Sequence, residues 1–292
     1  MTREFVERHR KTPSALAFMP RAFLPSPGLP PGAALPRITQ RWDGLHIDAG
    51  HLKAFCRATG LPEHGYAPII YPHVIGFRLQ MALLTHRAFP LPVWIALQIR
   101  NRLVQHRHLR VGERFDLETH IGTNRIVDKG TEIDLVSRLM HETNCCWESE
   151  VTYFFRGRFG SPADVSSAAA PDLAHAPVVD RFTIPSDGGW NFGVLTGDYN
   201  GIHWSNWYAR RFGFRAAFPH PQRVAGICLG RLEGPQSEAQ TLQIWIKGPL
   251  FYGSAVALSA ATEPGGTRFG VCLESDHRFA LSGQWRAGDA VQ

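Results

Sequence analysis

The hydrophobic pattern divides the chain into two similar halves, each with one long apolar run followed by shorter strand-like segments. The apolar runs cover residues 74–85 and 221–232, and the first is apolar around most of a helical circumference. A helix of that kind is buried on nearly all sides. Each half is therefore predicted to contain one central buried helix.

The segments that follow each predicted helix read as strands, and several alternate apolar with polar residues. Because consecutive segments are separated by short turn signals, we expect antiparallel pairing. Each half is then a buried helix with an antiparallel sheet that can wrap it, which is an α+β fold class. The predicted strands cover residues 93–104, 114–122, 131–142 and 146–156 in the first half, and 240–247, 255–262, 267–274 and 278–285 in the second.

Three short matches in the same order indicate that the two halves arose by internal duplication. Each match pairs a segment of the first half with one at a similar offset in the second. The pairs are residues 55–60 with 192–197, residues 71–73 with 218–220, and residues 97–99 with 242–244.

Two segments of different composition lie outside these halves. Residues 1–40 are rich in proline and predict an extended arm that lies across a surface rather than a packed element. Residues 161–178 contain a Ser-Ser-Ala-Ala-Ala-Pro run and predict a linker. The first half then covers residues 41–160 and the second half residues 179–292.

Composition excludes several classes of protein. The net charge of +6 comes mainly from arginine, because the chain has only four lysines. These arginines indicate either a solvated surface or a site for a phosphorylated substrate. Since no dense basic stripe with interleaved aromatic residues occurs, we expect no nucleic-acid partner. No apolar run is long enough to span a membrane, and no signal-peptide core follows the N-terminus, so we expect a cytoplasmic protein without a membrane partner.

Cysteine and histidine spacing gives no sign of a metal. The five cysteines include no CxxC, and their odd number argues against a disulfide framework and a structural zinc site. His106 and His108 have an i, i+2 spacing that suggests a metal, but no third ligand of suitable spacing accompanies them. We therefore expect neither a metal nor a cofactor.

Candidate chemistry is concentrated in residues 196–203, which read Thr-Gly-Asp-Tyr-Asn-Gly-Ile-His. Glycine and asparagine tolerate positive φ, so this backbone can turn sharply and bring Asp198 and His203 to face one point. An aspartate beside a histidine can hold a water molecule and move its proton. An apolar helix follows at residue 221, which makes a chance pairing of the two residues less plausible.

This segment resembles the hydratase signature of the MaoC-like, R-specific enoyl-CoA hydratase family, whose core reads G-D-x-N-P-x-H. Gly197, Asp198, Asn200 and His203 match that core. Downstream, the segments Phe-Gly-Phe (residues 212–214) and Phe-Pro-His (residues 218–220) resemble the family's approach to a His-Gly at the start of the central helix. The resemblance covers the second half, and the duplicated layout is similar to that of the double hot-dog members.

The resemblance implies that Asp198 and His203 activate one water molecule. In one direction they would deliver it to C3 of a trans-2-enoyl thioester and protonate C2. In the other they would dehydrate a 3-hydroxyacyl thioester. The partner would be an acyl-CoA or acyl-carrier-protein thioester. The substrate-binding residues implied are Asn200, Gly201, His220 and Gln222.

The sequence departs from the family signature at two positions. Gly201 replaces the family proline, a change expected to alter only the stiffness of the turn. Pro221 replaces the glycine of the His-Gly pair, whose backbone N–H is the donor expected for the thioester carbonyl. Proline has no N–H, and loss of one such donor typically lowers a rate by about 10²–10³-fold. The candidate substitutes are the backbone N–H of Gln222 and the side chain of Asn200.

The first half lacks the acidic and basic pair. Leu61 stands where the aspartate is expected, and Glu63 and His64 are interpreted as loop residues. We therefore expect one active site per chain, with the first half supplying part of the acyl cavity. Trp204 and Trp207 are expected to pack the overlying segment or to line an acyl tunnel.

Two alternative functions remain open from the sequence. A hot-dog thioesterase would use a carboxylate to activate water toward the carbonyl itself. A non-catalytic acyl-thioester binding protein would account for Pro221 and for the degenerate first half. Because two covalently joined halves can satisfy the interface of a hot-dog dimer, either a monomer or a homodimer is expected.

Overall fold

The first apolar run forms the central helix of the first half, as predicted. In the computed structural model, which describes residues 4–288, α3 (Tyr71–Leu84) has Pro72 in its first turn and is buried along most of its length. Proline suits that position because the first helical N–H groups have no intrahelical acceptor. Leu79 and Leu83 are completely buried, so the helix lies inside the half rather than on its surface.

Five antiparallel strands wrap this helix, which confirms the predicted layout of the first half. Their order in the sheet is β2-β6-β7-β8-β4. All four predicted strands are present, with β6 and β8 longer than expected and residues 93–95 forming a short 3-10 helix, η2, before β4. β2 was not predicted. Their bounds are β2 (Arg37–His46), β4 (Leu97–Gln105), β6 (Arg114–Val127), β7 (Gly130–His141) and β8 (Asn144–Arg156).

The second half repeats the arrangement around a shorter helix, α6 (Pro221–Leu229), whose last eight residues are all buried. Its strands follow the order β10-β13-β12-β11-β9. Four of them match the predicted segments, and β9 was not predicted. Their bounds are β9 (Val178–Thr183), β10 (Gln240–Ile246), β11 (Ala255–Glu263), β12 (Gly266–Leu273) and β13 (Leu281–Ala287).

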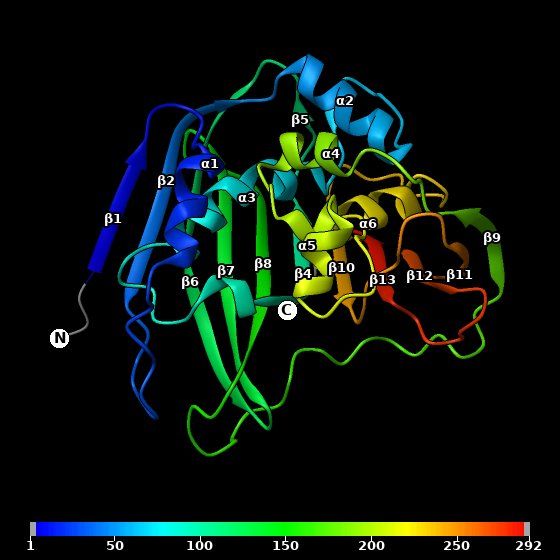
Figure 1. Cartoon of the computed structure of the whole chain (residues 1–292). Coiled ribbons are helices and arrows are strands. Elements are labelled where there is room, and N and C mark those ends of the chain that lie inside the picture. Colours follow the sequence, from blue (N-terminus) through cyan, green and yellow to red (C-terminus); the bar gives the residue numbers. More distant parts are fainter. Residues whose placement is uncertain (1–3, 289–292) are drawn as a thin grey trace.

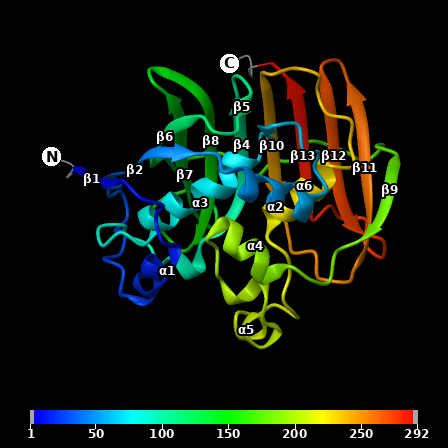
Figure 2. The same ribbon diagram turned by 90° about the horizontal axis from the view of Figure 1, so that it is seen from above.

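The two halves share one sheet. β4 pairs antiparallel with β10, from Arg100 opposite Trp245 to Gln105 opposite Gln240. The result is a continuous sheet of eleven strands in the described residues, with the helices on its concave side (Figures 1 and 2). A separate two-stranded sheet is formed by β3 (Tyr66–Ala67) and β5 (Leu109–Arg110).

A second pair of equivalent helices confirms the similarity of the halves. α2 (Ala49–Thr59) and α4 (Gly189–Thr196) contain the matched Phe-x-x-x-Thr-Gly segments. Each ends at a glycine in the left-handed region, with φ of 73° at Gly60 and 82° at Gly197. Glycine adopts this conformation at no steric cost. Helix ends of this kind reverse the chain, and in the second half the reversal leads directly into the Asp198 segment.

The proline-rich arm is more structured than predicted. β1 (Glu4–His9) pairs in parallel with β2, and α1 (Ala15–Phe18) and the 3-10 helix η1 (Met19–Phe23) follow it. The boundary predicted at residue 40 falls inside β2, and β1 of the arm pairs with this strand. The arm therefore belongs to the sheet of the first half. The expectation of an arm without packed elements is therefore wrong, because the prolines stand after residue 12 and leave β1 free to donate its N–H groups.

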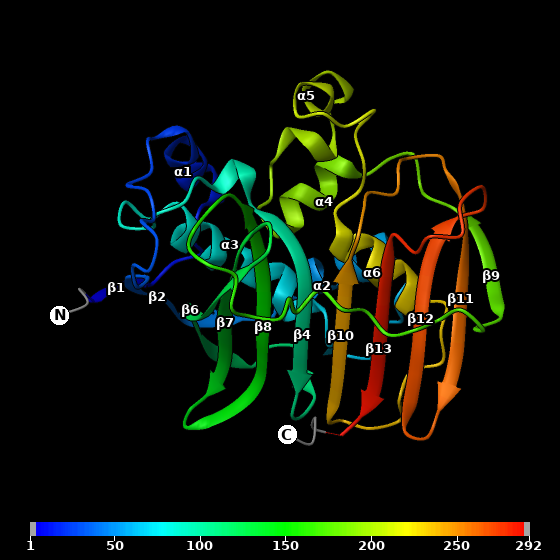
Figure 3. The same cartoon turned by 90° about the horizontal axis from the view of Figure 1, so that it is seen from below.

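The predicted linker has no helix or strand until β9 begins at Val178. It crosses the convex side of the sheet (Figure 3). Trp245 Nε1 donates to the carbonyl oxygen of Ser167 at 3.2 Å, and Lys247 Nζ donates to that of Ala168. These two hydrogen bonds attach the linker to β10 and to the residue that follows it in the second half. Residues 1–3 and 289–292 of the predicted arm and second half lie outside the described residues.

The remaining short elements lie together on one side of the molecule. The 3-10 helix η3 (Gly201–His203) and the helix α5 (Asn206–Arg211) follow α4 and precede α6. Figure 3 shows α4 and α5 beside the strand ends, near the middle of the sheet, with α5 projecting beyond them. Within residues 4–288, no helix has the length and apolar character that crossing a membrane requires.

Candidate active site

The Asp198 segment is folded by its own side chains. Gly197 reverses the chain, and the Thr196 hydroxyl accepts the backbone N–H of Asp198 at 2.8 Å. Asp198 Oδ1 accepts the N–H of Asn200 at 3.1 Å, and Asn200 Oδ1 accepts that of Ile202 at 3.3 Å. These are Asx turns, in which a short polar side chain replaces a backbone acceptor. The segment therefore turns as sharply as its composition predicts.

This turn brings the two predicted catalytic residues together. His203 Nε2 lies 3.6 Å from Asp198 Oδ2. His203 Nδ1 is 3.0 Å from the carbonyl oxygen of Phe218, to which it donates. The neutral ring then carries its proton on Nδ1, and its Nε2 lone pair faces the carboxylate region. The imidazole is almost fully buried, whereas the Asp198 side chain keeps 19% of its surface exposed, which leaves water a route to it.

His220 is the third member of the group. Its ring stacks on that of His203, with centroids 3.8 Å apart, and its Nε2 donates to the backbone carbonyl oxygen of Asp198 at 3.1 Å. The same Nε2 is 3.8 Å from Asp198 Oδ2. Its Nδ1 is buried and has no hydrogen-bond partner among the described residues. His220 therefore orients the Asp198 backbone through Nε2, and the lone pair of its Nδ1 accepts no hydrogen bond from the described residues.

Burial governs the ionisation of this group. It raises the pKa of the Asp198 carboxyl above its ordinary value, against the opposing effects of His203 and of the Asn200 N–H. It lowers the pKa of His203, and it lowers that of His220 further. Desolvation disfavours the charged form in all three cases. Both imidazoles are therefore neutral near pH 7, and Asp198 is a stronger base than an exposed aspartate.

The ligand atoms of these three residues lie within 4.8 Å of one another, a spacing that a metal ion could also occupy. His220 Nε2, however, bears the proton that it donates to the Asp198 carbonyl oxygen. A protonated nitrogen cannot be a metal ligand. The observed arrangement thus favours proton transfer over metal binding at this position.

Side chains of the first half contact the segment that leads to Asp198. Arg78 of α3 donates to the carbonyl oxygen of Val194 at 3.0 Å, and His51 of α2 has its Nε2 3.0 Å from that of Leu195. Both contacts fix the end of α4 immediately before the Asp198 segment. Since α2 and α3 belong to the first half, the site lies between the two halves.

Tyr153 is a further neighbour that the sequence did not reveal. It lies on β8, is buried, and donates from its hydroxyl to Gln80 Oε1 on α3 at 2.8 Å. Burial raises its pKa, and the Asp198 carboxylate adds to this effect. The Tyr153 hydroxyl therefore lies within range of the Asp198 charge and is hydrogen-bonded to Gln80. No sequence motif marks Tyr153, because β8 belongs to the first half and Asp198 to the second.

The remaining predicted site residues have structural partners of their own. Asn200 uses its Oδ1 to cap η3. Gln222 is buried, donates to Gln98 Oε1 at 2.8 Å, and lies 3.4 Å from His73 Nε2. Its side chain therefore joins the halves. Its backbone N–H has no acceptor among residues 4–288, as expected for the second residue of a helix that begins at Pro221.

Gly201 does more than relax the turn, which corrects the expectation from the sequence. It is buried, and a Cβ at this position would lie 2.7 Å from ring atoms of Tyr208. The Tyr208 ring thus takes the space that a proline side chain would fill.

We expect Gly201→Ala to destabilise the protein by about 1–3 kcal/mol, the usual range for overpacking. The atoms in the way include Cβ of Tyr208 at 3.2 Å, which cannot move without the backbone of α5. Urea unfolding measures the effect. Gly248→Ala is the matched control, because its Cβ would meet nothing within 4 Å. Equal unfolding midpoints for the two variants would contradict this account of Gly201.

The two tryptophans lie on the surface. Trp207 is 66% exposed, so it does not line a buried tunnel in this structure. Trp204 donates from Nε1 to the carbonyl oxygen of Tyr199 at 3.2 Å and packs edge-on against Trp190. Trp204 thereby covers the Asp198 segment from outside, in agreement with the first of its two predicted roles.

Comparison with known proteins connects this arrangement to solved structures. No protein-family model matches the chain, and the curated proteins searched contain no match. HtdX of Mycobacterium tuberculosis is similar in structure, with a TM-score of 0.73 and 21% identity over 85% of this chain and 99% of HtdX. A MaoC-like dehydratase from Phytophthora capsici has a TM-score of 0.71 and 16% identity over 88% of this chain and 96% of its own.

A conserved hypothetical protein of Mycobacterium tuberculosis, described as having a double hotdog fold, has a TM-score of 0.55 and 13% identity. That similarity covers 84% of this chain and 94% of the other. Each similarity spans both halves and the sheet that joins them. The chain thus has the double hot-dog fold, and it shares that fold with MaoC-like dehydratases.

Proposed function

We propose that the chain is an (R)-specific enoyl-thioester hydratase, or a 3-hydroxyacyl-thioester dehydratase in the reverse direction. The observation that carries the proposal is the approach of Asp198 Oδ2 and His203 Nε2 to 3.6 Å beside the start of α6. The fold shared with MaoC-like dehydratases supports it. The substrate would be an acyl-CoA or acyl-carrier-protein thioester.

In this mechanism one water molecule lies between the carboxylate and the imidazole. Both groups accept hydrogen bonds in the ionisation state described above, and water has two to donate. As the water oxygen forms a bond to C3, one proton passes to the Asp198–His203 pair. C2 then receives a proton from the pair, so that H and OH add across the double bond. General base catalysis of this kind contributes about 10²–10⁴-fold.

The thioester carbonyl also needs a hydrogen-bond donor, because negative charge develops on its oxygen as C3 is attacked. Pro221 cannot supply one. The Gln222 backbone N–H is the stronger candidate, because it lies one residue further into α6 and has no acceptor in the described part of the chain. Asn200 Nδ2 is the second candidate, since only its Oδ1 is used by the η3 cap.

Activity is expected to fall on the acid side of neutrality as Asp198 becomes protonated. Burial raises the pKa of Asp198, so the midpoint of this fall should lie above the ordinary aspartate value of about 3.9. Burial lowers the pKa of His203, so protonation of the imidazole is also displaced toward lower pH. The dependence of kcat/KM on pH measures the midpoint in the free enzyme, and circular dichroism at each pH shows that the fold is intact. A midpoint at or below the ordinary value would contradict a buried catalytic aspartate.

Pro221 favours one other function. A protein that binds acyl thioesters without converting them needs no donor at the carbonyl oxygen, and the first residue of α6 supplies none. In that case an enoyl-CoA would raise the melting temperature and remain unconverted. Turnover of the same ligand by the same preparation separates this function from the proposed hydratase.

A further inference from the structure

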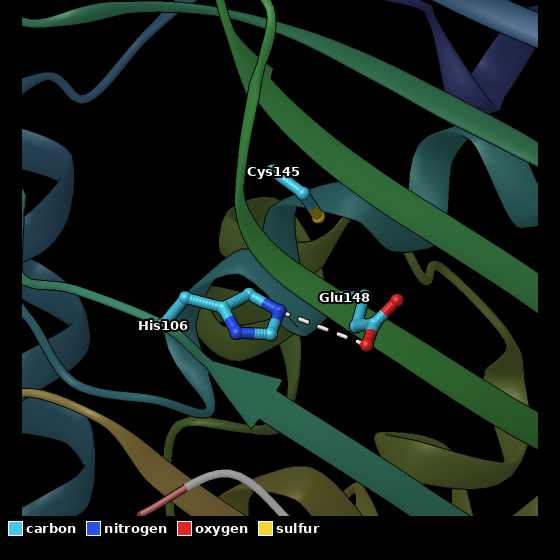
Figure 4. A group of neighbouring side chains, drawn as sticks. All are labelled: His106, Cys145 and Glu148. Carbon is cyan, nitrogen blue, oxygen red and sulfur yellow. Dashed lines mark ion pairs between the residues drawn. The ribbon is translucent and has the colours of Figure 1, made fainter.

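A second group of reactive side chains lies far from Asp198, where β4 ends beside β8. His106 directly follows β4, while Cys145 and Glu148 lie on β8. Their ligand atoms all lie within 4.8 Å of one another. Figure 4 shows the thiol, the imidazole and the carboxylate turned toward a common space. Figure 3 places the end of β4 opposite the side that bears α4 and α5.

A break in the strand register creates this group. In a regular strand Cys145 and Glu148, three residues apart, would point to opposite faces. The pairing of β8 with β7 shifts so that Met140 lies opposite Cys145 and Leu139 opposite Trp147. Cys146 is the extra residue of this bulge, and its side chain joins Trp147 in the core. Cys145 and Glu148 are thereby left on the same outer face.

The backbone and a neighbouring charge hold the group in place. The His106 N–H donates to the carbonyl oxygen of Cys146 at 2.9 Å, which fixes the histidine to the bulge. His106 Nε2 lies 3.6 Å from Glu148 Oε1, and Arg138 Nε lies 3.6 Å from the other carboxylate oxygen. Arg138 therefore orients the carboxylate and leaves Oε1 directed at the imidazole. Residues that bind a metal ligand, but not the metal itself, commonly fix the orientation of that ligand.

From this geometry we infer that His106, Cys145 and Glu148 bind a zinc ion. Zinc is held by cysteine at about 2.3 Å and by histidine and carboxylate at about 2.0–2.2 Å, so tetrahedral ligands lie about 3.3–3.6 Å apart. The 3.6 Å between His106 Nε2 and Glu148 Oε1 fits that spacing. A thiolate disfavours magnesium and calcium, which prefer oxygen ligands. Water completes the fourth position.

The site is accessible to a metal from solvent. The side chains of His106 and Glu148 are 28% and 30% exposed, and Cys145 is half-buried. Binding forms a Zn–S bond and releases the thiol proton to the solvent. The metal joins the end of β4 to β8 across the bulge. The sequence spacing of His106 and His108 did not suggest this group, because two of its ligands come from the neighbouring strand.

The test uses the full chain, freed of metal with a chelator and then titrated with Zn²⁺ in a calorimeter. We expect one zinc per chain. Cys145→Ser is expected to weaken zinc binding by more than about 100-fold, because loss of a residue that only orients a metal ligand already lowers metal affinity by about 10–100-fold. Co²⁺ in place of Zn²⁺ should give a thiolate-to-cobalt charge-transfer band that Cys145→Ser abolishes. Glu148→Gln provides a second variant if Cys145→Ser does not fold.

Two matched controls isolate the ligands. His108→Asn removes a histidine two residues from His106 that stacks on Tyr66, and Glu150→Gln removes a carboxylate two residues further along β8. Both should bind zinc as the wild type does. No zinc uptake, equal affinity in Cys145→Ser, or a cobalt spectrum without the thiolate band would overturn the inference. Loss of binding in His203→Ala would also overturn it, because the metal would then lie at the Asp198 group.

Discussion

Replacing Asp198 by asparagine is expected to lower the hydration rate of an enoyl-CoA by about 10²–10⁴-fold, the contribution of a positioned general base. Asparagine keeps the side-chain oxygen that accepts the Asn200 N–H, so the turn is preserved. It cannot take a proton from water. The loss should therefore appear in kcat, with the KM for the thioester nearly unchanged.

Loss of absorbance of the conjugated enoyl thioester measures this rate. Tyr199→Phe is a suitable control, because Tyr199 is next in sequence and its backbone carbonyl, rather than its side chain, accepts from Trp204. Equal rates for the wild type and Asp198→Asn would remove Asp198 from the mechanism. A melting temperature close to that of the wild type would show that the loss is chemical.

Replacing Arg125 by methionine is expected to cost about 3–5 kcal/mol of unfolding free energy, the usual cost of breaking a buried ion pair. Arg125 donates two hydrogen bonds of 2.6 Å to Asp134 and lies 3.2 Å from Glu132. Both carboxylates are only 1% exposed, so the variant would leave them buried without this cation. The pair joins β6 to β7 within the first half.

Urea unfolding compares this variant with Arg181→Met, which breaks the exposed pair of Arg181 with Glu274. An exposed pair contributes at most about 1 kcal/mol. Similar losses in the two variants would show that the carboxylates of β7 remain accessible to water. The expected difference would instead show that the buried network between β6 and β7 contributes more to stability than an exposed ion pair.

The sequence predicted the repeated elements because local patterns determine them. The apolar circumference of α3 and the alternation along β11 are properties of neighbouring residues, and both elements are present nearly as predicted. β1, β2 and β9 were missed. β1 and β9 are six-residue edge strands without a fully buried residue, and β2 begins inside the segment predicted as the arm. The positions of β1 and β9 depend on pairing with β2 and β11, which local patterns do not show.

The same distinction applies to the site. The approach of Asp198 to His203 was predicted from one turn-forming segment, since it needs only the local backbone, and their catalytic role stays a prediction. The influence of Asp198 on Tyr153 was not predicted, because it arises only when the first half packs against the second. The role of Gly201 was also misjudged, since the ring of Tyr208 that occupies its side-chain space comes from the next helix.

The central claim is that this chain adds water to an enoyl thioester, and the direct measurement is the product formed from crotonyl-CoA by the wild-type protein. The account predicts (R)-3-hydroxybutyryl-CoA, identified by chiral chromatography, with no free thiol released. Release of free CoA would indicate a thioesterase, in which water attacks the carbonyl carbon. Recovery of unchanged crotonyl-CoA, bound but not hydrated, would contradict a catalytic role for Asp198 and His203.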